Sequence, residues 1–382
     1  MAESHIVRVE WGVLAGRRPR NAGSNARRGE HGITVRVPIT RLTTDDGAQG
    51  FGVARVGDRD DAAALVGTPL ADLFAPERGV TDRWLPWEYA IWDLMAKRAN
   101  APVYTLAAAV NGRGRTPPAP YRVPCYDTSL YFDDLHLTRD DEAAALLAAE
   151  AREGYERGHR AFKIKVGRGA RYMPIEEGTR RDIAIVRAVR AAVGPGLPIL
   201  LDANNGYTLN LTKRVLAETA DCGIFWMEEP FHEDPLLYED LRAWLEREGL
   251  PILIADGEGD ASSHLLDWAR DGIVDVVQYD IFGHGFTRWL RTGKQLDGWN
   301  ARSAPHHYGG HIGNYTAAHL AGAIAGFTYV EWDEVTTPGL DAPGYIVRDG
   351  WVEAPDTPGF GLTLDEAAFR RAVETAGYDL AK

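Results

Sequence analysis

The chain is poor in cysteine and has no apolar run long enough to cross a membrane. Its 382 residues include two cysteines, Cys125 and Cys222, each inside a strand-like run. Two such cysteines do not form a disulfide framework, so we expect a reduced, cytoplasmic protein. No segment approaches the roughly 18 apolar residues of a transmembrane helix. The opening MAESHIVRVEWG lacks basic and apolar leader regions, so we expect no signal peptide and no membrane partner.

Positive charge is also scarce. The chain has 42 Lys and Arg residues against 55 Asp and Glu residues, a formal net charge of -13. Nucleic-acid binding requires a basic face, so we expect no nucleic-acid partner. What the chain does have is apolar residues: 45% are hydrophobic, enough for a sizeable core. Its length suits one large domain with a smaller one.

Residues 1–118 predict a small α+β domain. The runs SHIVRVEWGVL, ITVRVPITRLTT and QGFGVARV alternate apolar and polar residues, as in an antiparallel meander. Residues 16–31, between the first two runs, are rich in Gly, Asn and Arg and predict a long loop. Residues 58–112 predict helices, because WLPWEYAIWDLMAKRA places apolar side chains at helical spacing.

Strand-like and helical runs alternate over residues 119–335. The strand candidates are YRVPCYDTSL, AFKIKVG, PILLDAN, GIFWMEEP, PILIADGE, VDVVQYD, NARSAPHH and FTYVEWDE. Eight strands alternating with helices predict an α/β barrel of the (β/α)8 type. A doubly wound sheet usually has fewer strands and a glycine-rich phosphate turn, which is missing here. Residues 336–382 leave this repeat, and we expect them to fold back on the N-terminal domain.

Polar residues lie at or near the carboxyl ends of seven candidate strands. They are Lys163, Lys165, Asp202, Glu228, Glu258, Asp280, His306 and Glu331. In a barrel, this is the face on which active sites form. One charged strand end means little, but seven in succession indicate a site.

Three of these residues are acids that predict a metal ion. Asp202 and Glu228 end consecutive apolar runs, and Glu258 follows the next one. A buried carboxylate is costly unless it is paired, so three that converge require a cation. Mg2+ prefers oxygen ligands and leaves positions open for substrate. Asp256, two residues before Glu258, is a competing third ligand.

Eight motifs occur in a fixed order along nearly the whole chain. They are AIWDLMAKRANAPVY, KIKVG, LLDANNGY, MEEP, GEG, VVQYD, APHH and YVEW. Together they resemble the enolase superfamily, in its mandelate racemase/muconate lactonising enzyme branch. The resemblance implies a (β/α)7β modified TIM barrel with an α+β N-terminal capping domain that the C-terminal segment completes. It also implies one Mg2+ per active site, abstraction of the proton α to a carboxylate, and a homo-oligomer.

The resemblance assigns proton transfer to Lys165, with Lys163 lowering its pKa or touching the substrate. The two lysines stand two apart on one strand, so both point to the same side. Each cation lowers the pKa of the other, which suits a base near neutral pH. Metal binding is assigned to Asp202, Glu228 and Glu258.

Asp280 and His306 match the His–Asp dyad of the mandelate racemase-like branch. An Asp beside a His fixes the tautomer of the imidazole and raises its pKa. The muconate-lactonising pattern would instead place a lysine where this chain reads Gln278-Tyr279-Asp280. His307 is an alternative to His306, but adjacent strand residues point to opposite sides. Glu331 matches the acid that hydrogen-bonds the substrate carboxylate and, if protonated, would stabilise an enediolate.

Further substrate contacts are predicted in the loop and beside the strands. The loop over residues 16–31 contains five arginines: Arg17, Arg18, Arg20, Arg27 and Arg28. They could hold a distal carboxylate or hydroxyls of the substrate, or form only solvated ion pairs. Asn204, Tyr126 and Asp127 are additional candidates.

The two bases allow two reactions. A proton taken by one and returned by the other inverts the centre, as in a racemase or epimerase. Loss of the β-hydroxyl instead gives a 2-keto-3-deoxy acid. Many relatives with this pattern dehydrate acid sugars, so we predict a lyase (hydro-lyase) of carbohydrate catabolism acting on an acid sugar. A metal-dependent hydrolase would usually show histidine ligands on the first strand, and YRVPCYDTSL has none. A non-catalytic binding relative should have lost a base.

Overall fold

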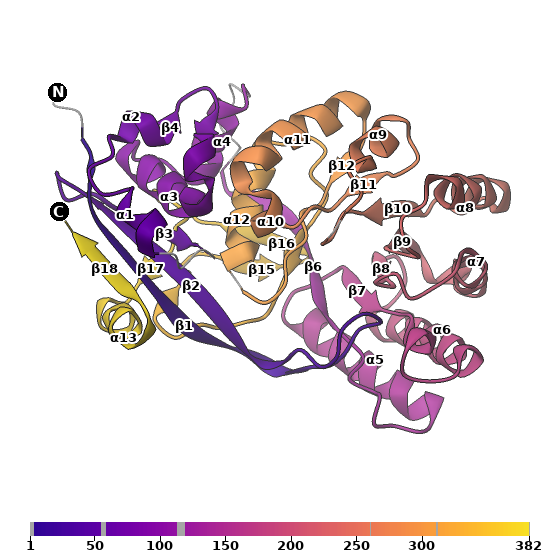
Figure 1. Ribbon diagram of the computed structural model, residues 1–382. Helices are drawn as coiled ribbons and strands as arrows, with labels where there is room; N and C mark the ends of the chain where they lie inside the picture. Colours follow the sequence, from indigo (N-terminus) through magenta and orange to yellow (C-terminus); the bar gives the residue numbers. More distant parts are fainter. Residues whose placement is uncertain (1–3, 55–58, 113–118, 260, 311, 382) are drawn as a thin grey trace.

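The computed structural model describes residues 4–54, 59–112, 119–259, 261–310 and 312–381. Figure 1 shows a capping part near the two chain ends and a barrel part beside it. The end of the predicted run QGFGVARV, and the residues just before the predicted boundary at 118/119, lie outside the described residues.

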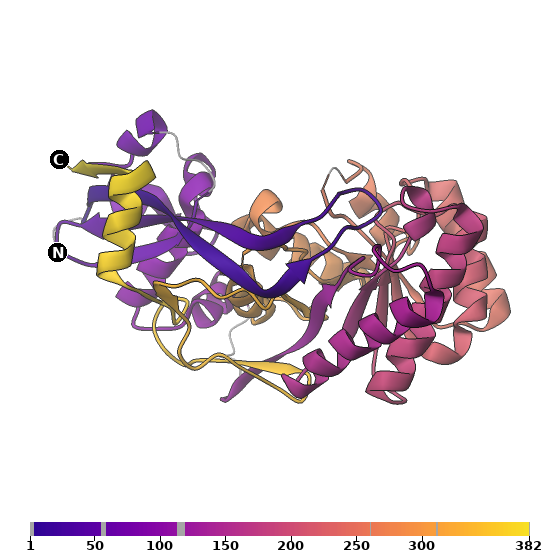
Figure 2. The same ribbon diagram turned by 90° about the horizontal axis from the view of Figure 1, so that it is seen from below.

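The capping part is built on a four-stranded antiparallel sheet in the order β18–β1–β2–β3. Its strands are β1 (Ile6–Ala22), β2 (Gly32–Thr44), β3 (Gln49–Val53) and β18 (Tyr378–Ala381). The expected loop over residues 16–31 was too long, because β1 continues to Ala22. Arg17 still pairs with Thr34 of β2, so cross-strand hydrogen bonds keep this polar stretch extended. The β1–β2 hairpin reaches from the cap to the barrel (Figure 2).

Short helices cover this sheet. They are α1 (Arg59–Ala63), α2 (Leu70–Leu73), the 3-10 helix η1 (Asp82–Trp87), α3 (Glu88–Arg98) and α4 (Val103–Val110). The strands β4 (Phe74–Ala75) and β5 (Gly79–Val80) interrupt the region expected to be helical. Helix α3 packs closely on β3, since a Cβ on Gly50 would collide with the backbone of Leu94.

Eight parallel strands form the barrel. They are β6 (Tyr121–Leu130), β7 (Phe162–Lys165), β8 (Ile199–Asp202), β9 (Ile224–Glu228), β10 (Leu253–Asp256), β11 (Val276–Val277), β12 (Arg302–Ser303) and β13 (Val330–Trp332). Each predicted strand run contains one of them. Strands β6 to β12 pair in chain order, and β13 pairs with β6. The barrel closes where the Ser303 N–H donates to the Gly326 carbonyl at 3.0 Å.

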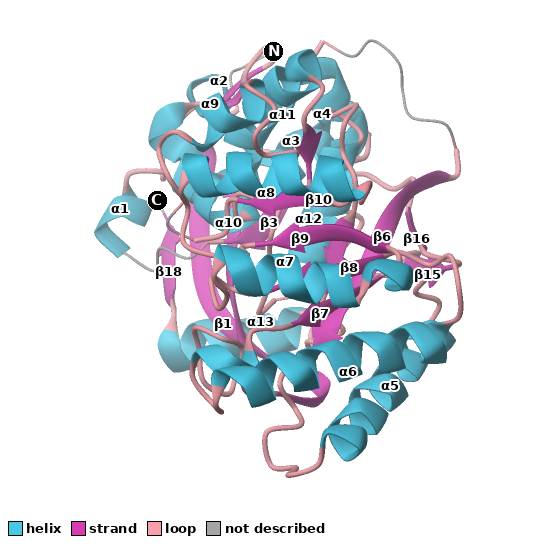
Figure 3. Cartoon of the chain, turned by 90° about the vertical axis from the view of Figure 1, so that its right-hand side faces the viewer, coloured by secondary structure: helices cyan, strands magenta, loops and turns pink. Residues whose placement is uncertain are grey.

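Helices on the outside connect these strands. They are α5 (Asp140–Glu156), η2 (Arg168–Ala170), α6 (Ile175–Val193), α7 (Leu209–Glu218), η3 (Ala220–Cys222), α8 (Pro235–Glu248), α9 (Leu265–Arg270), α10 (Ile281–His284), α11 (Phe286–Trp299) and α12 (Ile312–Ala321). Figure 3 shows α5 to α8 covering strands β7 to β10. Inside the barrel, Tyr126, Leu200, Trp226 and Val276 form a buried apolar plug. Among the described helices, none is long and apolar enough to span a membrane.

The C-terminal segment contacts both parts. Its elements are β14 (Leu340–Asp341), β15 (Ile346–Arg348), β16 (Trp351–Ala354), β17 (Thr363–Leu364), α13 (Glu366–Ala376) and β18. Strand β16 pairs antiparallel with β6, beside the parallel strands. Strand β18 then adds an edge to the capping sheet by pairing with β1. The chain therefore ties the barrel to the cap after the barrel is complete (Figure 2).

Candidate active site

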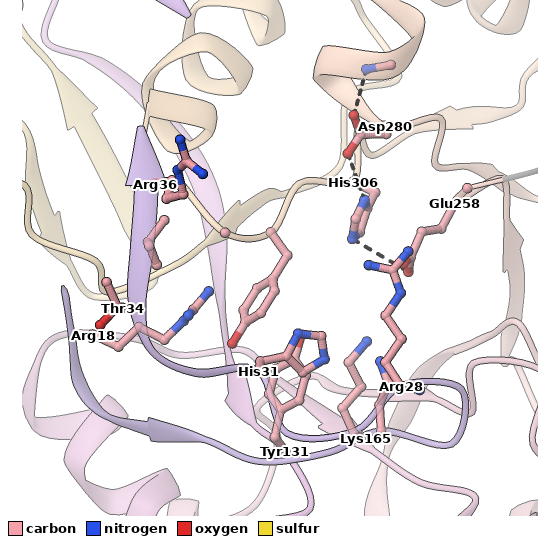
Figure 4. Close-up of a pocket in the computed structure, with 16 residues that line it drawn as sticks. Arg18, Arg28, His31, Thr34, Arg36, Tyr131, Lys165, Glu258, Asp280 and His306 are labelled. Carbon is pink, nitrogen blue, oxygen red and sulfur yellow. Dashed lines mark hydrogen bonds and ion pairs between the residues drawn. The ribbon is translucent and has the colours of Figure 1, made fainter. Parts of the chain in front are cut away.

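A cavity of about 500 Å3 lies between the carboxyl ends of the barrel strands and the β1–β2 hairpin. From the barrel, Lys165, Glu258, Asp280 and His306 line it. From the hairpin side, it is lined by Arg18, Asn25, Arg28, His31, Thr34, Val35 and Arg36. Figure 4 shows Lys165 and His306 pointing into the same space from different walls. The two predicted proton-transferring groups thus face one cavity.

The three predicted metal ligands converge. One ligand oxygen from each of Asp202, Glu228 and Glu258 lies within 4.8 Å of the others. Asp202 and Glu228 are fully buried at the ends of β8 and β9. Glu258 Oε2 is buried but has no hydrogen-bond partner among the described residues. An all-oxygen donor set with a buried oxygen that accepts no hydrogen bond within the described part of the chain fits a hard divalent cation such as Mg2+.

Asp256 is turned away from this group. Its carboxylate accepts hydrogen bonds from the Tyr238 hydroxyl and, at 2.6 Å, from the Gly257 N–H. Burial raises the pKa of Asp256 well above its usual range. Both oxygens of Asp256 are occupied by Tyr238 and Gly257, so the geometry favours Glu258 as the third ligand.

The two lysines of β7 share one carboxylate, and Lys163 has two more. Lys163 Nζ lies 3.0 Å from Glu228, 2.9 Å from Glu331 and 3.5 Å from Asp202, whereas Lys165 Nζ pairs with Asp202. Burial alone would lower the pKa of each lysine, but these carboxylates outweigh it and raise the pKa of both. Repulsion from Lys163 lowers the pKa of Lys165, as expected, but the carboxylates outweigh this effect in this arrangement. A divalent cation at the carboxylates would repel both ammonium groups and oppose this rise.

His306 is held by Asp280 on one side and faces acids on the other. Its Nδ1 lies 3.1 Å from Asp280 Oδ2, and its Nε2 lies 3.5 Å from Glu258 Oε2 and 4.0 Å from Glu331 Oε2. Burial lowers the pKa of His306, but Glu258, Glu331 and Asp280 together raise it to about 10. The imidazole is therefore protonated in this arrangement and can act as an acid.

His307 and Glu331 are hydrogen-bonded to each other, and Glu331 lies beside the dyad, with 4.0 Å between its Oε2 and His306 Nε2. The His307 ring points away from the cavity and bonds the Glu331 backbone carbonyl at 2.6 Å. Glu331 accepts from Thr128 Oγ1 at 2.6 Å and from the His307 N–H at 2.9 Å. Burial raises the pKa of Glu331, yet Lys163 and His306 bring it below its usual range. The protonated Glu331 considered above is thus disfavoured here.

The other predicted substrate residues divide into two groups. Of the five arginines in residues 16–31, Arg18 and Arg28 line the cavity. Arg17 and Arg27 are exposed, and Arg20 binds Ser129 and Glu153 outside the cavity.

Three further predicted residues lie beneath or behind the cavity. Tyr126 packs inside the barrel against Trp226. Asp127 faces outward to α5, 3.8 Å from Arg157. The Asn204 amide donates to Glu229 at 3.0 Å. The directions of these three side chains follow from the alternation of side chains along each strand and turn. Residue type alone could not predict these directions.

The sequence reasoning missed an aromatic and basic wall. Tyr131 and Tyr308 stack with 4.9 Å between ring centroids, and the His31 ring packs edge-on against both. The Arg18 guanidinium lies 4.4 Å over Tyr308. Burial and nearby cations lower the pKa of His31 to about 4, so its ring is neutral. Thr34 and Arg36 could have been found as an i, i+2 pair on one face of the second strand.

A buried network fixes the end of β7. Arg168 Nη1 donates to the Lys165 carbonyl at 3.1 Å and to Asp182 at 2.8 Å, and Nη2 donates to Asp134 at 2.6 Å. Arg168, Asp134 and Asp182 are all fully buried. The strand end that presents Lys165 is therefore anchored by a paired, hydrogen-bonded charge cluster.

Comparison with known proteins places this site in a family. The model of the family described as enolase C-terminal domain-like matches residues 146–368. The chain therefore belongs to the enolase C-terminal domain-like family. This confirms the enolase-superfamily membership predicted from the ordered motifs.

Solved structures agree over the whole chain. A galacturonate dehydratase from Geobacillus sp., complexed with D-galacturonate and 5-keto-4-deoxy-D-galacturonate, is 45% identical and covers 100% of both chains with a TM-score of 0.94. A mandelate racemase/muconate lactonizing protein from Geobacillus sp. Y412MC10, complexed with magnesium and tartrate, is also 45% identical. It covers 100% of this chain and 98% of that chain with a TM-score of 0.96. The predicted barrel with a capping domain is confirmed.

A curated relative is more distant. Arabinonate dehydratase from Saccharolobus solfataricus is 28% identical over 73% of this chain and 69% of that protein.

Proposed function

We propose that this protein is an Mg2+-dependent dehydratase of a hexuronate, with D-galacturonate as the first substrate to test. One observation carries the proposal: Lys165 and His306 face a single cavity, next to three converging carboxylates. The galacturonate dehydratase that matches the full chain at 45% identity supports the choice of a uronate. Acid-sugar dehydration is also the reaction predicted from the sequence.

The metal ligands, the two lysines and the His306–Asp280 pair have different roles in the reaction. Asp202, Glu228 and Glu258 would hold Mg2+, which supplies positive charge to stabilise the enediolate form of the substrate carboxylate. Lys165, which the charge of the bound cation would favour as a neutral amine, takes the proton from the carbon next to that carboxylate, and Lys163 adds positive charge nearby. His306, held by Asp280, gives its proton to the leaving β-hydroxyl. The C–H and C–O bonds break, water leaves, and the resulting enol becomes a ketone.

The hairpin side of the cavity suits the polar end of a sugar. Arg18 is 7% exposed, and its Nη2 lies 3.4 Å from Asp333, so one carboxylate already balances its charge. His31 is a neutral ring with a buried Nε2 that has no partner among the described residues. These groups offer hydrogen bonds to hydroxyls at the end of the sugar far from the carboxylate.

The alternative is a racemase or epimerase that uses the same Lys165 and His306. The two reactions differ in the fate of the β-hydroxyl, which the dehydratase removes and the racemase or epimerase keeps. A metal-dependent hydrolase fits less well, because the one candidate metal group among the described residues contains carboxylates without histidine.

A substrate panel tests the proposal. The purified enzyme with Mg2+ would be assayed against hexuronates, aldonates and aldarates, with kcat/KM measured for each. We expect D-galacturonate to give the highest kcat/KM and a keto-deoxy product. If an aldarate or aldonate gave the highest kcat/KM, the choice of a uronate substrate would be wrong. A change of configuration without loss of water would show that the enzyme is an epimerase.

A further inference from the structure

Helix α3 of the cap touches the turn that follows Asp280. The hydroxyl of Tyr89 donates a hydrogen bond to the carbonyl of Ile281. The Tyr89 ring packs edge-on against Phe282, with 5.3 Å between centroids. Tyr89 is 4% exposed, so little water competes for this hydrogen bond.

The preceding residue of α3 extends the same contact. Glu88 accepts hydrogen bonds from the backbone N–H groups of Phe286 and Thr287, each at 2.8 Å. It approaches so closely that a Cβ on Gly285 would collide with its carboxylate, and Gly285 has a φ of +95°. The cap thus holds both ends of the segment from Ile281 to Phe286.

That segment supports the catalytic dyad. Asp280 Oδ1 accepts from the N–H groups of Phe282 and Gly283 at 3.0 and 2.6 Å. Its other oxygen, Oδ2, is the one that lies 3.1 Å from His306 Nδ1. Figure 4 shows Asp280 linking the first turn of α10 to His306. The orientation of the His306 ring therefore depends on where these two amides lie.

Helix α10 is too short to fix the positions of the Phe282 and Gly283 amides by its own helical hydrogen bonds. It has four residues, and a single helical turn is unstable in isolation because nucleation fixes several dihedrals for one hydrogen bond. The contacts with Tyr89 and Glu88 are made by a different part of the chain. They add to a direct backbone link between the turn and the dyad, in which the Ile281 N–H donates to the His306 carbonyl at 2.8 Å.

We propose that Tyr89 and Glu88 are positioning residues for the reaction: they hold the Ile281–Phe286 segment so that Asp280 can orient His306. This rests on the proposed function, because it assigns proton transfer to His306. Neither side chain lines the main cavity. The proposed route to the substrate runs through the dyad; Gly283 of the held segment also lines the cavity.

A double-variant cycle separates this role from simple loss of stability. The variants are Tyr89→Phe, Asp280→Asn and the two combined, with Tyr104→Phe as the matched control. Tyr104 is 3% exposed on α4, and its hydroxyl donates to Asp356 at 3.1 Å, so the control loses one comparable hydrogen bond elsewhere. Turnover and KM are measured on the substrate that the wild type dehydrates.

We expect Tyr89→Phe to lower kcat about tenfold with KM changed less than about twofold. In the Asp280→Asn background, the same change should have no further effect, because the link it acts through is already lost. The control should keep wild-type kcat. The proposal is overturned if Tyr89→Phe matches the control, or if its effect multiplies with that of Asp280→Asn.

Amide hydrogen exchange tests the same contact without any substrate. Amide hydrogen exchange over residues 281–285 should be faster in Tyr89→Phe than in the wild type and in Tyr104→Phe, and unchanged exchange overturns the proposal. Should Tyr89→Phe fail to fold, Glu88→Gln is used, with the same expectations for exchange and for the cycle. A wild type inactive on every acid sugar would refute the proposed function, while the exchange result still decides whether α3 holds the turn.

Discussion

Lys163 and Lys165 share one side of β7, yet their surroundings give them different tasks. Lys163 is enclosed by Glu228, Glu331 and Asp202, whereas Lys165 pairs with Asp202 and reaches the cavity. An ammonium group enclosed by three carboxylates is available for charge balance. A group at the cavity wall is available for proton transfer.

Loss of either cavity base should stop turnover without removing the metal site. We expect Lys165→Ala and His306→Ala each to lower kcat by a factor of roughly 10^2–10^4. Mg2+ affinity, measured by titration calorimetry, should stay within about tenfold of the wild type. Lys213→Ala, which removes a partly exposed ion pair with Asp240, is the control and should keep full turnover. A protein that only binds its ligand would show no turnover even before substitution.

Two matched substitutions test whether Glu258 or Asp256 is the third metal ligand. We expect Glu258→Gln to weaken Mg2+ binding by more than about 100-fold, beyond the effect typical of outer-shell groups. Asp256→Asn should have a small effect, since the carboxyl that bonds Tyr238 is replaced by an amide of the same shape. The reverse order of the two dissociation constants would make Asp256 the ligand.

For single residues, the sequence predicted which residue types form the site better than it predicted the direction in which each side chain points. The order of polar strand ends identified Lys165, Glu258 and His306, which do line the cavity. It could not exclude Asp127 or His307, because one residue of shift along a strand turns a side chain to the opposite face. That direction is fixed by pairing with distant strands.

The secondary-structure elements around β7 are held by Arg168, whose partners come from the loop after β6 and from α6. Removing one partner of a buried charge cluster leaves the other charges uncompensated. We expect Arg168→Met to lower the free energy of unfolding by about 3–5 kcal/mol, measured by urea denaturation. Arg180→Met, which removes an exposed contact with Asp140, should cost about 1 kcal/mol or less. Equal losses for the two variants would contradict this account.

Helix α12 contains a histidine that makes stability depend on pH. His319 is fully buried; its Nδ1 accepts from the Tyr104 N–H at 2.9 Å, and its Nε2 lies 2.7 Å from the Tyr345 hydroxyl. Burial lowers the pKa of His319 to about 3. The unfolded chain, with an ordinary pKa of about 6.5, then binds the proton first as pH falls. This contribution is complete above pH 6.5 and is lost between about pH 6.5 and 3.

We therefore expect the wild type to lose up to about 1.4 kcal/mol of stability per pH unit from this residue within that window. His319→Gln should show a shallower slope when free energies of unfolding are measured from pH 7 to pH 4. The exposed His264→Gln serves as the control. Parallel slopes for wild type and His319→Gln would refute the assignment.

The whole molecule joins a hairpin and a barrel that are far apart in sequence and line one cavity. The strand–helix repeat predicted the barrel, because each repeat carries its own periodic signal. The wall made by His31, Thr34, Arg36 and Tyr308 was not predicted, because it forms only when the hairpin meets the barrel. The same holds for the contact of Tyr89 with Ile281. The homo-oligomer and the cytoplasmic location remain predictions; light scattering checks the first.

The most direct test of the central claim is proton NMR of D-galacturonate with the wild-type enzyme and Mg2+ in D2O. We predict loss of the signals of the proton next to the carboxylate and of its neighbour. New methylene or CHD signals of a 4-deoxy-5-keto acid should appear at the same rate, and chelation of Mg2+ should stop them. Loss of the α-proton signal with the carbon skeleton intact would contradict dehydration and establish the epimerase instead.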